Sequence, residues 1–293
     1  MDNIPLYEGK RKNILVLSGG GLKFFSVMGA VLALNELEII DKPDVYCGTS
    51  SGAVISLLLN IGYTPEDIFS VFYKVNFENL VIDNIENILD SACFGFIIPD
   101  KGINIISLFM KNKQIDSKIT FKQLYELTKS KLIIPGTCVN DESVHYFSVD
   151  NTPDMEVLLA VRITTAIPII FTPCEYDNKI WIDGGCINNY PIDLFNNKLT
   201  DVVGIYTGDA NEVVENFEDI PSYIQKVFKC IMRGLNHNKI KLFEKYTIYI
   251  NCTKNPSTKW DISKKEKKKL YKLGYDTAMK KFADVPRIPV DSA

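Results

Sequence analysis

Ser50 is the first candidate for chemistry, because it lies at the centre of Gly48-Thr49-Ser50-Ser51-Gly52, the one frame of this stretch that fits G-x-S-x-G. A sharp strand-to-helix turn leaves little room two positions either side of its central residue, which explains the two glycines. Such a turn exposes the serine hydroxyl beside the first amides of a helix, where developing negative charge is stabilised. The pattern predicts a nucleophile; helix capping by small polar residues is the alternative explanation.

Three consecutive glycines, Gly19 to Gly21, end the first apolar run of the chain. The amides of Gly20 and Gly21 would project from a turn there without side chains in the way, and would suit an anion. That anion is either a phosphate or the oxyanion of an acyl-transfer intermediate. The dinucleotide fingerprint needs glycine where this chain has Phe24, and no G-K-[ST] loop occurs, so a nucleotide is disfavoured. A glycine turn that only lets strand and helix pack closely is the structural alternative.

A serine nucleophile needs a base, and the chain has only two histidines, His145 and His237. Neither lies in an acid-bearing local motif, and lone histidines are more often structural. Asp183 is the better candidate, because an apolar strand leads into it and the amides of Gly184 and Gly185 follow, where they can orient a carboxylate. Asp-Gly is also a common hairpin turn, and that explanation wins if Asp183 is considered alone.

The elements that must position these residues alternate between strand and helix. Strands are predicted near 13–18 and 44–48, and helices follow each of them at 22–37 and 53–60. Two strand-then-helix units in succession indicate an α/β fold with a parallel sheet. Further helices are predicted at 65–75, 120–129, 154–165 and 221–245, and strands at 131–139, 144–149, 169–176, 179–183, 201–206 and 246–252.

One domain over residues 1–293 is the simplest organisation, since the chain shows no repeat, linker or low-complexity tract. Residues 76–119 lack a sustained period and suggest an inserted cap of short helices. The apolar stretch 93–100 within it is interpreted as a lid, a membrane-contacting loop, or the buried core of the insertion. A lysine-rich helical tail at 263–283 is expected near the end of the chain; its lysines form either an anionic-membrane contact or a solvated face.

Composition excludes several classes. The net charge of −3 disfavours a nucleic-acid partner. The seven cysteines are odd in number and never spaced C-x-x-C, which argues against a disulfide framework and a zinc site and favours an intracellular, reducing location. The polar start of the chain predicts no secretory signal, and no apolar run approaches the roughly 18 residues that span a bilayer. We expect a soluble or peripheral membrane protein without a metal or cofactor.

These motifs together resemble the patatin-like phospholipase family, because three of its motifs occur here in the family's order. Residues 19–24 are similar to its glycine-rich oxyanion motif, residues 48–52 to its nucleophile elbow, and residues 183–185 to its catalytic aspartate motif. The resemblance covers about residues 13–206. It implies a three-layer α/β/α fold with a mainly parallel central sheet, a Ser-Asp dyad without histidine, and metal-free hydrolysis of lipid acyl esters.

The resemblance also implies roles for individual residues. Ser50 would be the nucleophile and Asp183 the base, while the amides of Gly20 and Gly21 would hold the oxyanion. The residues expected to support these motifs are Gly19, Lys23, Gly48, Gly52, Gly184 and Gly185.

Two positions near the glycines depart from the family's pattern. Phe24 stands where the family has glycine, and its ring would tighten the loop or crowd the acyl group. Ser18 replaces an aspartate of some members, a change expected to be harmless. Lys23 matches the arginine or lysine of the family.

The resemblance leads to a phospholipase A-type lipid acyl hydrolase that forms an acyl-enzyme on Ser50 and acts on phospholipid or another acyl lipid. Two alternatives stay open. One is a broad esterase or thioesterase that uses the same dyad on small acyl substrates. The other is a non-catalytic lipid-binding relative whose oxyanion loop is spoiled by Phe24.

Overall fold

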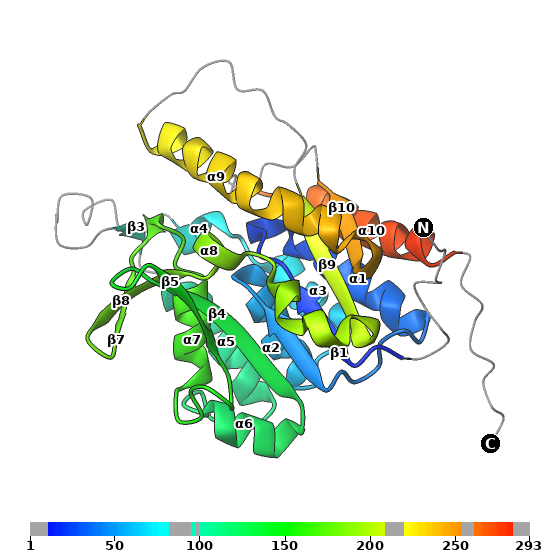
Figure 1. The fold of residues 1–293 in the computed structure, drawn as a ribbon, viewed down its shortest axis with the longest axis horizontal. Coiled ribbons are helices and arrows are strands. Elements are labelled where there is room, and N and C mark those ends of the chain that lie inside the picture. Colours follow the sequence, from blue (N-terminus) through cyan, green and yellow to red (C-terminus); the bar gives the residue numbers. More distant parts are fainter. Residues whose placement is uncertain (1–10, 82–94, 98–99, 209–219, 253–260, 284–293) are drawn as a thin grey trace.

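The computed structural model of the protein describes residues 11–81, 95–97, 100–208, 220–252 and 261–283 (Figure 1). Its centre is an eight-stranded sheet in the order β10-β9-β1-β2-β4-β8-β7, with β5 paired to β4. The neighbours from β10 to β4 are parallel, and the pairs that involve β5, β7 and β8 are antiparallel. The strands are β1 (Ile14–Leu17), β2 (Val45–Gly48), β4 (Lys131–Cys138), β5 (Ser143–Phe147), β7 (Cys174–Tyr176), β8 (Lys179–Asp183), β9 (Val202–Gly208) and β10 (Thr247–Asn251).

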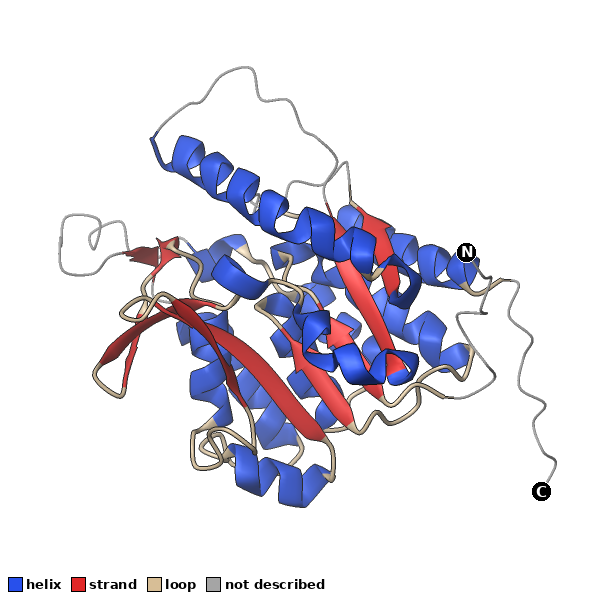
Figure 2. Ribbon diagram, in the orientation of Figure 1, coloured by secondary structure: helices blue, strands red, loops and turns tan. Residues whose placement is uncertain are grey.

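Helices connect the strands and cover the sheet (Figure 2). A separate two-stranded sheet pairs β3 (Gly95–Ile97) with β6 (Ile169–Phe171). The α-helices are α1 (Phe24–Glu36), α2 (Ser51–Asn60), α3 (Pro65–Lys74), α4 (Glu78–Val81), α5 (Asp100–Asn112), α6 (Phe121–Thr128), α7 (Val157–Thr164), α8 (Gly185–Asn188), α9 (Ile220–Leu242) and α10 (Lys264–Lys281); the 3-10 helices are η1 (Gly21–Lys23), η3 (Pro191–Asp201) and η4 (Glu244–Tyr246).

The side chains of β1 point alternately into two different cores, which shows why the fold has three layers. Leu15 and Leu17 lie in a large core that includes side chains of α1, α2, α3, α5, α6, α7 and α10. Ile14 and Val16 belong to a second, smaller core. Successive side chains of a strand point to opposite faces, so each face of β1 is buried by its own helical layer. The fold is therefore a three-layer α/β/α sandwich with a mainly parallel sheet, as the sequence predicts.

The lysine-rich helix α10 is part of the large core. Gly29 on α1 and Gly274 on α10 mark where the two helices touch, since a Cβ added at either position would overlap backbone of the other helix. Buried Lys267 donates hydrogen bonds to the carbonyls of Phe72 and Val75 at the end of α3. These bonds satisfy carbonyls that a helix end leaves unpaired. One lysine of this run therefore has a structural task, while others, such as Lys265, are exposed.

The segment 76–119, expected as an inserted cap, contributes α5 to the large core. Ile106, Phe109 and Met110 of α5 are buried there, and the helix contacts α2 and α7. Residues 82–94 and 98–99 lie outside the described residues, and with them half of the apolar stretch 93–100. This half of the segment therefore packs on the sheet layer as a regular helix.

The structure differs from the sequence-based expectation at two other elements. The expected strand 169–176 is two short strands, β6 and β7, with Pro173 between them. Proline lacks the amide that a continuous ladder requires, which explains the break. The 3-10 stretch η3 was not anticipated, because its sequence carries no regular apolar period. Among the described residues, no helix combines the length and the apolar character needed to cross a membrane.

Candidate active site

Ser50 sits at the sharp turn between β2 and α2, as its pentapeptide predicts. Its backbone has φ 53° and ψ −126°, values that a residue other than glycine rarely adopts. Its amide donates to Thr164 Oγ1 at 3.1 Å, which helps hold the turn in this conformation. The side chain is 7% exposed. A strained backbone conformation of this kind persists only where surrounding contacts hold it in place, and such conformations are concentrated at functional sites.

Glycine is required on both sides of Ser50 because backbone passes too close for a side chain. A Cβ at Gly52 would lie 2.6 Å from the carbonyl oxygens of Leu17 and Ser18, at the end of β1. A Cβ at Gly48 would overlap the carbonyl of Gly52. The tight strand-turn-helix geometry that the sequence predicted thus brings the ends of β1 and β2 together.

The glycine loop after β1 borders Ser50. A Cβ at Gly19 would lie 3.0 Å from the Ser50 Cβ, so the loop and the serine are in direct contact. Gly21 has φ +54°, in the left-handed region that favours glycine. The amide of Gly20 donates to Ser51 Oγ at 3.2 Å. Ser51, which the sequence marked only as a flanking residue, therefore orients one of the two amides expected to hold an oxyanion.

Asp183 ends β8 and is 5% exposed. Its Oδ1 accepts a hydrogen bond of 2.7 Å from the Gly185 amide. Burial raises the pKa of Asp183 to about 7, and hydrogen bonding from the Ser50 side chain and the Gly185 amide opposes the rise. The structure therefore brings together the two side chains that lie 133 positions apart in the sequence, and it gives the carboxylate a pKa suited to accepting a proton near neutrality.

Asn189 joins the aspartate turn to the glycine loop, a role the sequence analysis missed. Its Nδ2 donates to the Gly19 carbonyl at 3.2 Å, and its backbone carbonyl accepts the Gly19 amide at 3.2 Å. Its Oδ1 lies where a Cβ on Gly19 or Gly185 would collide. The signal available in the sequence was the polar pair Asn188-Asn189, which follows the Asp-Gly-Gly turn after two apolar residues.

Two of the supporting residues, Gly184 and Lys23, and the departure Ser18 are held in place by close contacts. Gly184 packs so closely on Pro135 that any side chain would overlap its carbonyl oxygen. Lys23 is buried at the N-cap of α1. Ser18, at the position where some relatives of this motif have aspartate, accepts the Thr207 amide at 3.0 Å and so links β1 to β9.

The ring of Phe24, a departure from the family's glycine, is accommodated in an aromatic cluster. It lies 4.4 Å from the ring of Phe25, 5.1 Å from Phe72 and 5.9 Å from Phe77, measured between centroids. Phe24 is 7% exposed. The side chain is thus placed by the large core between α1 and α3, where aromatic pairs in these geometries stabilise packing.

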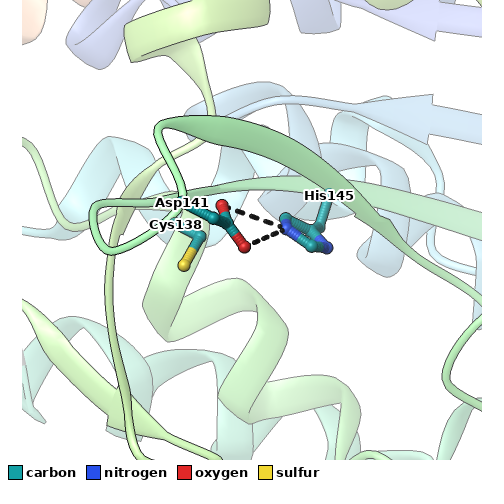
Figure 3. Close-up of side chains that lie close together, drawn as sticks. All are labelled: Cys138, Asp141 and His145. Atoms are coloured by element: carbon teal, nitrogen blue, oxygen red, sulfur yellow. Dashed lines mark hydrogen bonds and ion pairs between the residues drawn. The ribbon is translucent and has the colours of Figure 1, made fainter.

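His145 lies on β5 in a different cluster (Figure 3). Its Nε2 is 3.1 Å from Asp141 Oδ2, and Lys179 Nζ is 3.0 Å from the same oxygen. Hydrogen bonds from Ser143 and Lys179 hold the pKa of Asp141 well below its usual range. These contacts make His145 part of an ion-pair and hydrogen-bond network at the β4–β5 hairpin. His237 is exposed on α9.

The same network contains the side chains that could ligate a metal. The ligand atoms of Cys138, Asp141 and His145 all lie within 4.8 Å of one another. The Asp141 carboxylate already accepts bonds from Ser143, Lys179 and His145, which account for the arrangement without an ion. We assign no metal to these residues.

Comparison of the sequence with known proteins supports the assignment of this chain to a family. The profile of the family described as Patatin-like phospholipase matches residues 15–196, a range that contains the glycine loop, Ser50 and Asp183. A probable lipid hydrolase, 463L, of Invertebrate iridescent virus 6 is 38% identical over 184 residues, which cover 61% of this chain and 62% of that protein. A cGAMP-activated phospholipase of Escherichia coli is 22% identical over 254 residues, covering 77% of this chain and 69% of that protein.

Solved structures share the fold. VipD from Legionella pneumophila superposes with a TM-score of 0.68 at 18% identity, covering 94% of this chain and 67% of VipD. The type III effector protein ExoU superposes with a TM-score of 0.51 at 15% identity, covering 93% of this chain and 53% of ExoU. At such identities the likeness concerns the fold alone, whereas the family profile covers more than half of the sequence. The chain belongs to the patatin-like phospholipase family.

Proposed function

We propose that this protein is a phospholipase A-type lipid acyl hydrolase that cleaves carboxylic esters with Ser50 and Asp183. The observation that carries the proposal is the buried Asp183 carboxylate, whose pKa burial raises to about 7 while the neighbouring Ser50 side chain opposes the rise. The names of the relatives, lipid hydrolase and phospholipase, support an acyl lipid as the substrate.

In the first half of the proposed reaction, Ser50 Oγ attacks the ester carbonyl carbon while Asp183 takes the hydroxyl proton. The carbonyl oxygen becomes an oxyanion beside the amides of Gly20 and Gly21. Without substrate, the Gly20 amide donates its hydrogen bond to Ser51 Oγ at 3.2 Å. A charged oxygen is a stronger acceptor than a hydroxyl, so the amide would transfer to the oxyanion as it forms.

The intermediate then collapses by breaking the bond to the alcohol, which leaves with the proton held by Asp183. An acyl ester on Ser50 remains. A water molecule gives its proton to Asp183 and attacks this ester, and the return of the proton to Ser50 Oγ releases the fatty acid. Asp183 alternates between base and acid, which a pKa near 7 favours more than the ordinary aspartate value of about 3.9.

The placement of Phe24 supports catalysis over the non-catalytic alternative. That alternative depended on the ring spoiling the oxyanion loop, and the ring packs instead among Phe25, Phe72 and Phe77. A small-ester or thioesterase activity uses the same dyad. Rates on monomeric and aggregated lipid distinguish it, because an interfacial enzyme accelerates on aggregates.

Labelling by a fluorophosphonate probe tests the dyad directly, since only an activated hydroxyl reacts. We expect the wild type to be labelled at Ser50 and to release fatty acid from phospholipid, and Ser50→Ala to do neither. Asp183→Asn should reduce both by at least about a thousandfold, because the base is lost. His145→Ala is the matched control and should retain both activities. Loss of labelling in His145→Ala together with labelling of Asp183→Asn would reverse the assignment.

A further inference from the structure

Helix α9 carries a row of exposed apolar side chains along its length. Tyr223, Val227, Ile231 and Leu235 are 52%, 40%, 56% and 52% exposed, and Leu242 is 75% exposed. A step of four residues advances about 40° around a helix, so the first four cover a sector of about 120°. Leu242, seven residues further, returns to the same sector. Five large apolar side chains therefore form one surface stripe, which we call the α9 stripe.

The α9 stripe is not the side of the helix that packs on the protein. Asn236 is buried, and Ile240 and Phe243 pack into the smaller core. These residues project from a sector close to half a turn away from the middle of the stripe. The body of the protein thus uses one face of α9 and leaves the apolar stripe on the opposite face, at the surface.

Basic residues lie between the packed face of α9 and one edge of the stripe. The sequence of the helix contains Lys226, Lys229, Arg233, Lys239 and Lys241 and no acidic residue, although the whole chain has a net charge of −3. Helical spacing places Lys226, Arg233 and Lys241 in this basic sector, and Arg233 and Lys241 are exposed. A helix with an apolar stripe flanked by basic residues has the composition that binds at the surface of an anionic bilayer.

Helix α9 is attached to the turn that carries Asp183. It contacts α8, the short helix directly after Asp183, and lies next to it in Figure 1. Lys239 donates to Asn188 Oδ1 at 2.8 Å and forms an ion pair of 2.9 Å with Asp193. Ile187, on α8 itself, is also exposed at 38%. A surface bound by the stripe would therefore lie beside the candidate active site.

We infer that the α9 stripe docks on anionic lipid bilayers. The apolar side chains enter the interface between headgroups and acyl chains, and the basic sector contacts anionic headgroups. Docking would bring lipid substrate close to Ser50, and this consequence rests on the proposed lipid hydrolase function, whereas the docking itself does not. The charge of the helix selects a bilayer over a second copy of this chain, because two such helices would repel each other.

The test is flotation with phosphatidylcholine vesicles, with and without phosphatidylserine, in a Ser50→Ala background that removes hydrolysis. We expect flotation with phosphatidylserine. The double exchange Ile231→Ser and Leu235→Ser should weaken it at least about tenfold. The matched control is the double exchange Leu108→Ser and Leu127→Ser. These two leucines, on α5 and α6, are each 59% exposed, and the control protein should float as the parent does.

Two charge variants separate α9 from α10. Arg233→Gln with Lys241→Gln should weaken flotation and reduce its salt dependence, because it removes two contacts with anionic lipid. Lys265→Gln with Lys269→Gln, on the exposed side of α10, should leave flotation unchanged. An equal loss in the α10 variant would transfer the contact to α10 and overturn the inference.

Hydrolysis by the protein with Ser50 intact separates this inference from the proposed function. The Ile231→Ser/Leu235→Ser protein should lose activity on vesicles and keep it on a soluble short-chain ester. Unaltered flotation of this variant, or a change from dimer to monomer in light scattering, would overturn docking on lipid. If no ester is cleaved by any protein while flotation behaves as expected, the proposed function fails and the docking surface stands.

Discussion

At the scale of single residues, the titration of Asp183 controls the proposed chemistry. Its pKa is raised to about 7 by burial, and only the ionised carboxylate can accept the Ser50 proton. The rate constant kcat/KM on a soluble ester should therefore rise about tenfold per pH unit below pH 7 and level off above it. A pH–rate profile measures this.

Histidine titrates in the same range, so the control is His145→Ala. It should leave the midpoint of the profile unchanged, since His145 interacts with Asp141 and Ser143. A midpoint that moves in this variant, or a rate that stays constant from pH 8 to pH 5, would contradict the assignment of the base to Asp183.

Asn189 is expected to act as a positioning residue. Its amide nitrogen holds the Gly19 carbonyl, and Gly19 packs on Ser50. Removing one hydrogen bond of about 1 kcal/mol that fixes the oxyanion loop should lower kcat roughly fivefold in Asn189→Ala, with KM little changed. Fluorophosphonate labelling should slow in parallel, because it uses the same geometry.

The matched control is Asn151→Ala, which removes a similar bond, from Nδ2 to the Tyr146 carbonyl at 2.8 Å. This exposed bond lies on another loop, so kcat and labelling should match those of the wild type. An equal effect of both exchanges would show that Asn189 acts only through stability.

The sequence predicted the positions of Ser50 and Asp183 because each follows a short apolar strand, and glycines lie on both sides of Ser50 and directly after Asp183. It did not predict Asn189 or Thr164. Asparagine and threonine are common in loops, and their contacts with Gly19 and Ser50 depend on how separate segments fold back on one another. Local patterns reveal residues that need an unusual backbone, but not the side chains that support them from a distance.

At the scale of elements, the packing of α10 on α1 depends on two glycines. A Cβ at Gly274 would overlap the Ser26 carbonyl of α1, so Gly274→Ala forces the helices apart. Strain of this kind should reduce the free energy of unfolding by roughly 1–3 kcal/mol. Urea unfolding followed by circular dichroism measures the change.

Gly234 on α9 provides the control, because a Cβ there would meet no atom within 4 Å. Alanine is the better helix former, so Gly234→Ala should raise stability by about 0.5–1 kcal/mol. If the two exchanges shift the unfolding midpoint in the same direction, close packing at Gly274 is not limiting.

The order of strands and helices was predictable where the apolar period was strong, as in β1, α1 and β2. It was least predictable over 76–119, where α5 proved to pack in the large core. The hydrophobic residues of α5 are spread among polar ones, and only the arrangement of α2 and α7 determines which of them are buried. Tertiary contacts, more than local propensity, decide such segments.

At the scale of the whole molecule, the three-layer fold joins segments that are remote in sequence into one site. The ends of β1 and β2 are parallel neighbours, which places the glycine loop beside Ser50. Strand β8 runs antiparallel to β4, and this pairing delivers Asp183 to the same region. Burying an ionised carboxylate costs free energy of folding, and the packing of the core offsets this cost at Asp183.

That cost makes the stability of the protein depend on pH. Between about pH 4 and pH 7, Asp183 is protonated when folded and ionised when unfolded, since its pKa rises from 3.8 to about 7 on folding. Unfolding then releases a proton, so this group lowers the free energy of unfolding as the pH rises to 7, and the contribution is constant above. Asp183→Asn cannot ionise and should lack this loss. Its advantage over the wild type should be near zero at pH 4 and reach a few kcal/mol at pH 8.

Urea midpoints measured across this pH range for the wild type and Asp183→Asn test the argument. Asp177→Asn, in the exposed turn between β7 and β8, is the matched control and should follow the wild type at every pH. Parallel curves for the wild type and Asp183→Asn would mean that the carboxylate is ionised at little cost. Together with the loss of hydrolysis expected for Asp183→Asn, a widening gap would show that the fold gives up stability to keep a proton acceptor beside Ser50.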